Sequence, residues 1–208
     1  MSFEVVPVRR HALGLPAGSI RAGLVLGVVA LIGAIILIPS RGVVAIPPYL
    51  IYLLFMMLGH YFAAHGVTIA TRDEPSPSPL YLPGGVVRFL VIVALLGCFG
   101  WKIYADQEGL YKQFEKSLDE LKVQPFMPLV ILGGFILGVT VRSIVGRTNP
   151  PAAWQDIEAW FALMAFVGLT VAAVVHIIID PSFEDRIMMP MWEGSVGGII
   201  AFYFGERS

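Results

Sequence analysis

Long apolar runs separated by short polar stretches dominate this chain. A membrane-spanning helix needs about 20 mostly apolar residues. Six runs approach that length: 20–39, 47–66, 84–104, 126–146, 156–179 and 188–205. Pro190 and Glu193 interrupt the sixth run, so five spans and one half-buried segment are the alternative. The pattern predicts an all-α polytopic membrane protein, with about six transmembrane helices in a single membrane domain over residues 1–208.

The polar stretches between the runs predict three helical hairpins, roughly 20–66, 84–146 and 156–205. A linker at 71–81 is rich in proline and serine and separates the first hairpin from the second. Proline lacks the amide hydrogen that a helix interior needs, so this linker should not be helical.

The connection between the third and fourth runs differs from the others. Leu110, Phe114, Leu118 and Leu121 recur at spacings of four, four and three residues. This spacing predicts an extramembrane amphipathic helix over 104–124. Exposing such a stripe to water costs on the order of 1.5–3 kcal/mol for each large side chain. We therefore expect it to dock on lipid, on the bundle or on a partner protein.

A seven-residue motif occurs twice, each time at the start of an apolar run. Residues 15–21 and 82–88 both read L-P-x-G-x-[IV]-R. Proline and glycine favour a turn before a helix, and Arg21 and Arg88 then lie about one turn inside, where a long stem can reach lipid headgroups. A weaker likeness joins 59–65 with 201–207. Two alternatives explain these likenesses. One is a parallel internal duplication of the chain, and the other is that helix ends at a lipid surface prefer similar residues.

Composition and charge are typical of a membrane protein. Charged residues make up 14% of the chain, against about 25% in soluble domains, and the net charge of -1 gives no reason to expect a nucleic-acid partner. With the N-terminus inside, eight basic residues are cytoplasmic and six are not, and three of those six lie in the amphipathic segment. By the positive-inside rule both termini should be cytoplasmic. We expect an integral protein of the bacterial inner (cytoplasmic) membrane.

Small residues recur one helical turn apart in several predicted spans. Such pairs let helix backbones approach closely where lipid offers no hydrophobic gain. They are candidates for packing within the chain or for a subunit interface: Gly23 with Gly27, Gly134 with Gly138, and Gly194 with Gly198.

Ionisable residues inside the apolar runs are costly, so each is a candidate site. They are His60, His65, His176, Asp180 and Glu193. At about 1.5 Å per residue, His60 would lie about 18 Å below the outer surface and His176 about 5 Å below it, which disfavours a haem held between them. We expect these histidines to be neutral and hydrogen-bonded within the bundle. The sequence predicts no metal and no cofactor, and leaves open whether a histidine binds a pigment or haem.

No catalytic motif stands out. An intramembrane serine protease is the nearest enzyme class, since Ser195 has glycine neighbours and His176 lies on the preceding run, but no Gly-x-Ser-x-Gly pattern surrounds Ser195. The sequence therefore favours a non-catalytic membrane subunit or scaffold, whose partners are the bilayer and other proteins or further copies of itself. The alternative is an oligomeric channel or transporter for ions or small solutes, lined by a glycine-rich face such as 194–198.

Overall fold

All the regular structure in the described part of the chain is helical. The computed structural model describes residues 12–16, 18–37, 46–63, 79–82, 85–123, 126–145, 152–175 and 189–207. The predicted all-α class is confirmed for these residues.

Each predicted apolar run corresponds to one α-helix. The helices are α1 (Ser19–Leu37), α2 (Pro48–Ala63), α3 (Val86–Val123), α4 (Met127–Val145), α5 (Ala152–Val174) and α6 (Met189–Glu206), with single 3-10 turns η1 (Ala12–Gly14) and η2 (Pro79–Tyr81). The amphipathic helix expected over 104–124 is the second half of α3 rather than a separate element.

Four helices, α1, α3, α4 and α5, are long and apolar enough to cross a membrane. Only 11% of the apolar 18-residue stretch of α3 and 17% of that of α4 are buried inside the bundle, against 56% of that of α1. The outer flanks of α3 and α4 therefore offer large apolar side chains such as Phe89 and Leu96 to their surroundings, which fits a membrane protein. The apolar part of α2, Pro48–Phe62, is shorter, and α6 is mostly buried inside the bundle. The expectation of six spans is thus supported for four helices.

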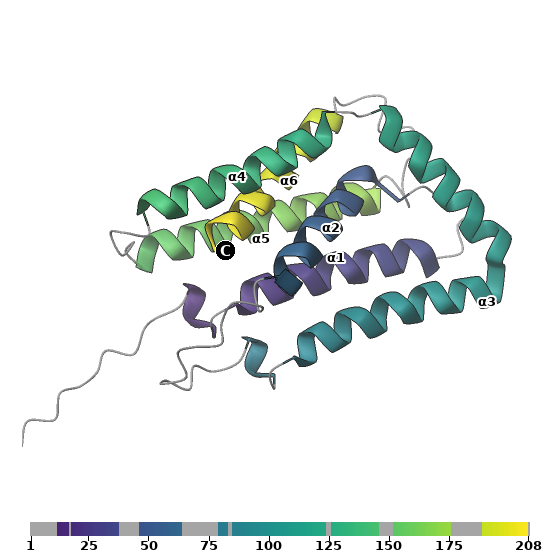
Figure 1. Ribbon diagram of the computed structural model, residues 1–208, viewed down its shortest axis with the longest axis horizontal. Coiled ribbons are helices and arrows are strands. Elements are labelled where there is room, and N and C mark those ends of the chain that lie inside the picture. The colour runs from purple at the N-terminus through teal and green to yellow at the C-terminus, as the bar shows by residue number, and fades with distance from the viewer. Residues whose placement is uncertain are drawn as a thin grey trace, which may run out of the picture.

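The helices pack in an order different from the predicted hairpins. The first part of α3 packs along α1, and α4 packs along α6. Figure 1 shows α4 and the first part of α3 on opposite sides of the bundle. The predicted hairpin over 84–146 is therefore not supported. Its two helices are kept apart because the second half of α3, residues 107–123, crosses one end of the bundle and carries the chain from one side to the other (Figure 1).

A single residue, Asp106, divides α3 into these two halves. Its backbone leaves the helical region (φ -160°, ψ 75°), and its Oδ1 accepts a hydrogen bond of 2.9 Å from the Gly109 amide. This is the geometry of an N-cap, which satisfies an otherwise unpaired amide at the start of a helix. The Gly109 amide, followed by the Lys102 ammonium, lowers the pKa of this exposed carboxyl, which lies beyond the apolar run. We call residues 107–123 the outer helix.

The described residues in and before the two copies of the L-P-x-G motif have positive φ at matching positions. Leu13 and Leu80, in the preceding 3-10 turns, have φ of 57° and 55°. Gly18 and Gly85, just before α1 and α3, have φ of 81° and 91°, which favours glycine. The likeness therefore extends two residues further back than the motif. The duplication itself stays a prediction.

Each 3-10 turn is fastened to the first turns of another helix. The Leu13 amide donates to Oδ1 of Asp156 in α5 at 2.6 Å, and the Leu80 amide donates to Oγ of Ser19 in α1 at 2.8 Å. These bonds satisfy the amides and hold the beginnings of α5, α1 and α3 together.

Candidate functional site

Polar side chains gather at the end of the bundle where α1, α3 and α5 begin and α2, α4 and α6 end. We call it the arginine end, because Arg21, Arg88, Arg142 and Arg207 all lie there. Arg142, near the end of α4, donates a long hydrogen bond of 3.4 Å to the Glu206 carbonyl.

The centre of the arginine end is a group of two buried and three partly buried polar side chains, which we call the Arg207 network: Arg21, His60, Glu158, Glu206 and Arg207. Arg207 Nη2 lies 3.2 Å from Glu158 Oε2, and its Nε lies 2.7 Å from Glu206 Oε2. The second pair is close enough for charge attraction but is not aligned as a hydrogen bond. Both glutamate side chains are over nine-tenths buried. Ionised groups are rarely buried unless paired, so Arg207 holds both carboxylates in place.

Arg21 joins this network to α1 and α2. Its Nη1 donates to the Arg207 carbonyl oxygen at 2.7 Å and lies 3.2 Å from His60 Nε2. A guanidinium has no acceptor, so this contact requires a neutral His60 whose Nε2 accepts. The His60 ring also meets the edges or faces of Phe135 and Phe204, with centroids 6.1 and 5.6 Å away. Arg21 therefore ties helices together at their ends instead of only reaching toward lipid headgroups.

Of the other ionisable candidates, the structure describes only Glu193, which lies away from this network. Glu193 is buried in α6 near the opposite end of the bundle. His65, His176 and Asp180 lie outside the described residues. Among the residues that the structure describes, no three His, Cys, Asp or Glu side chains lie together as metal ligands would.

The predicted glycines of α4 lie against the backbone of α6 within one chain, and Gly134 faces the predicted Gly198. A Cβ added at Gly134 would collide with the Gly198 carbonyl, and one added at Gly138 would collide with the Phe202 carbonyl. Gly205 does the same on α6 and was not singled out from the sequence. These glycines let the two backbones touch, which is the arrangement that small residues at one-turn spacing allow.

The remaining predicted glycines have different surroundings. A Cβ at Gly27 would lie 2.5 Å from the Phe166 ring of α5, and one at Gly194 would make only ordinary contacts at 3.9 Å. Gly23 is exposed and faces open space. A subunit interface at the glycines stays a prediction.

The outer helix is attached to the bundle by polar as well as apolar side chains. Ser117 is 1% exposed, accepts the Ile46 amide at 2.9 Å and donates to the Gln113 carbonyl at 2.7 Å. Leu110 is buried on the same side, and Phe114 stacks on Phe99 with centroids 5.7 Å apart. Gln113 is also buried, at 6% exposure. Two side chains on the buried side of this helix are thus polar, and the periodicity of apolar residues alone does not reveal them.

The predicted apolar stripe is only partly covered. Leu110 is buried, Phe114 is 38% exposed and Leu118 is 57% exposed, while Leu121 lies in the helix but its side chain is outside the described part. Tyr111, next to the stripe, is 74% exposed.

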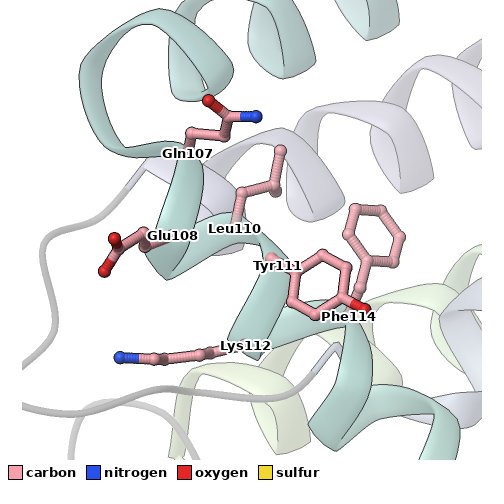
Figure 2. Close-up of a pocket in the computed structure, with 6 residues that line it drawn as sticks. All are labelled: Gln107, Glu108, Leu110, Tyr111, Lys112 and Phe114. Carbon is pink, nitrogen blue, oxygen red and sulfur yellow. The ribbon is translucent and has the colours of Figure 1, made fainter.

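A pocket of about 400 Å³ opens beside the first turns of the outer helix. It is lined by Gln107, Glu108, Leu110, Tyr111, Lys112 and Phe114. In Figure 2 the charged ends of Glu108 and Lys112 point away from Leu110 and Phe114. The pocket therefore has an apolar wall and a charged rim.

Comparisons with protein-family models, with curated proteins and with solved structures find no match for this chain.

Proposed function

We propose that this protein is a non-catalytic integral membrane subunit that docks a partner protein on its outer helix. The observation that carries the proposal is the state of that helix. It is fixed to the bundle through Ser117 and Leu110, yet Tyr111, Phe114 and Leu118 remain exposed along its flank.

The position of these three side chains supports docking. At spacings of three and four residues they lie on one stripe of the helix, between its buried side and its charged side. Burying exposed apolar surface contributes about 25 cal/mol per Å², and aromatic residues are enriched at protein interfaces. A rigid helix that presents such a stripe loses little conformational entropy when a partner binds.

The test compares two double variants of the outer helix. Tyr111→Ser with Leu118→Ser removes exposed side chains only, so the bundle should fold and insert as before. Lys112→Ser with Glu115→Ser is the control, because it changes two exposed residues of the same helix and leaves the net charge unchanged. We expect native mass spectrometry of the purified protein to show loss of the co-purifying partner, or of the oligomer, in the first variant alone.

Two results would contradict the proposal. An assembly of unchanged mass in the Tyr111 and Leu118 variant would mean that the stripe rests on lipid. Equal loss in both variants would mean that assembly depends on the helix as a whole rather than on its apolar flank.

A transport role is the competing proposal, and the buried acids favour it. Glu158, Glu193 and Glu206 are buried on α5 and α6, and ionisable residues within membrane helices often mark ion or proton pathways. In liposomes, a membrane subunit without transport activity should give no ion or solute flux above protein-free controls. A robust flux that Glu193→Gln abolishes would replace the subunit proposal.

A further inference from the structure

Among the described residues, the arginine end carries four arginines against three carboxylates, those of Asp156, Glu158 and Glu206. Arg207 pairs with both Glu158 and Glu206. Within the described residues no carboxylate pairs with Arg21, Arg88 or Arg142. Arg21 donates to the Arg207 carbonyl oxygen and contacts the His60 ring, and Arg142 donates to the Glu206 carbonyl oxygen. Unbalanced cations at the end of a membrane helix bundle attract anionic groups.

Of these arginines, Arg88 has the fewest hydrogen-bond partners among the described residues. It is the third residue of α3, and its guanidinium carbon lies 5.7 Å from the Tyr61 ring centroid and 5.8 Å from that of Phe62. Aromatic faces attract the cation but accept none of its in-plane N–H donors. Its Nη2 is buried and has no hydrogen-bond partner. The rest of the side chain is partly exposed, so a ligand can approach it from outside, and Nη2 reaches that ligand when the guanidinium turns outward.

A second cation lies close to the same position. The Arg88 guanidinium lies over the Tyr61 ring, and Arg21 Nη1 lies 3.2 Å from Nε2 of His60, the residue before Tyr61 in α2. Arg21 donates only to neutral groups. An anion beside Tyr61 would therefore meet two arginines that have no carboxylate partner among the described residues.

The surroundings of Arg88 are apolar, which distinguishes a lipid from a soluble anion. Phe62 and Phe89 are 41% and 65% exposed. Arg88 lies two residues inside α3, about 3 Å along its axis, which is the depth of headgroups when α3 spans the bilayer. A phosphate there would have apolar side chains below it, as acyl chains require.

We propose that Arg88, together with Arg21 and Tyr61, binds the phosphate of an anionic lipid headgroup at the arginine end. The planar guanidinium matches a phosphate with two parallel hydrogen bonds. The bound lipid would satisfy the Arg88 donors and hold the beginning of α3 against the end of α2.

The test measures lipid binding to the full-length protein in detergent by native mass spectrometry. The probes are phosphatidylglycerol, phosphatidylcholine and inorganic phosphate. We expect wild type to prefer phosphatidylglycerol to phosphatidylcholine. Arg88→Gln should weaken phosphatidylglycerol binding about tenfold, as expected for loss of a charge-assisted hydrogen-bond pair. Arg142→Gln is the matched control, because it removes the same charge from the same end of the bundle. Arg142 belongs to α4, which lies on the opposite side of the bundle from the first part of α3 (Figure 1).

The outcomes are distinct. Loss of phosphatidylglycerol binding in Arg88→Gln but not in Arg142→Gln supports the site. An equal loss of phosphatidylglycerol binding in Arg142→Gln overturns it, as does a wild type that does not prefer the anionic lipid. Displacement of the lipid by inorganic phosphate would overturn the lipid assignment in favour of a soluble ligand. If Arg88→Gln does not fold, Arg88→Lys keeps the charge without the planar fork. Wild-type affinity in Arg88→Lys would then refute the two-bond geometry.

Discussion

The contact between α4 and α6 gives a sharp prediction, because Gly133 and Gly138, both inside α4, face different surroundings. A Cβ at Gly138 would collide with the Phe202 carbonyl and lie 2.7 Å from the Glu206 amide nitrogen. Both are backbone atoms of α6, so no side-chain rotation can relieve the overlap. A Cβ at Gly133 would meet nothing within 4 Å.

The magnitude follows from comparing Gly138→Ala with Gly133→Ala. Replacing glycine by alanine inside a helix stabilises it by about 1 kcal/mol, and this gain is common to both variants. The difference between them therefore isolates the overlap at Gly138. Overpacking costs about 1–3 kcal/mol. In a chain of this size that corresponds to about 2–12 °C between the two melting temperatures.

The assay is thermal unfolding in detergent followed by circular dichroism. We expect Gly133→Ala to melt slightly above wild type and Gly138→Ala to melt below Gly133→Ala by the stated margin. Equal melting temperatures for the two variants would refute the close backbone approach of α4 and α6. A higher melting temperature for Gly138→Ala than for Gly133→Ala would refute it more strongly.

Three further predictions concern the cap, the charge network and the topology. Gly109→Ala would push the Asp106 carboxylate off its amide, at a cost of about 1 kcal/mol; hydrogen exchange should quicken in the first turn of the outer helix, and unchanged protection would contradict the cap. Arg207→Met leaves two buried carboxylates without their partner and should lower the free energy of unfolding by about 3–5 kcal/mol. Adding Glu158→Gln should recover part of that loss in the same denaturation assay, and no recovery would mean that the two residues are not coupled. With both termini cytoplasmic, a cysteine placed at Ser208 should react with an impermeant reagent only from the cytoplasmic side and one at Glu115 only from the outside, whereas labelling of both from one side would overturn the proposed topology.

Local chemistry explains why the sequence predicted the helices well. Apart from the end of α3, which continues into the outer helix, each observed α-helix begins and ends within a few residues of an apolar run, because a helix satisfies its own backbone hydrogen bonds and its length follows from composition. The turns before α1 and α3 were also readable, since Gly18 and Gly85 occupy positions of positive φ that glycine favours. The outer helix was predicted from spacing alone.

The arrangement of the helices could not be predicted from local sequence. Connection lengths suggested that α3 and α4 pair, but the outer helix separates them, and the capped bend at Asp106 sets its direction. The polar attachment of Ser117 to the Ile46 amide joins positions 71 residues apart. The pattern of apolar residues along one helix does not predict a polar partner so distant in sequence.

The sequence by itself determined the helical class, the helix positions and the sparse charge inside the apolar runs, since these depend on neighbours along the chain. The tertiary structure alone decided which charges meet. Glu158, Glu206 and Arg207 look like ordinary residues near helix ends, yet they form one buried network because α5 and α6 pack together. Arg21 and Arg88 occupy the same motif position, but one bonds to the Arg207 carbonyl and the other lies over two aromatic rings without a hydrogen-bond acceptor at its buried Nη2. That difference depends on which helix end lies beside each arginine, and only the three-dimensional packing sets it.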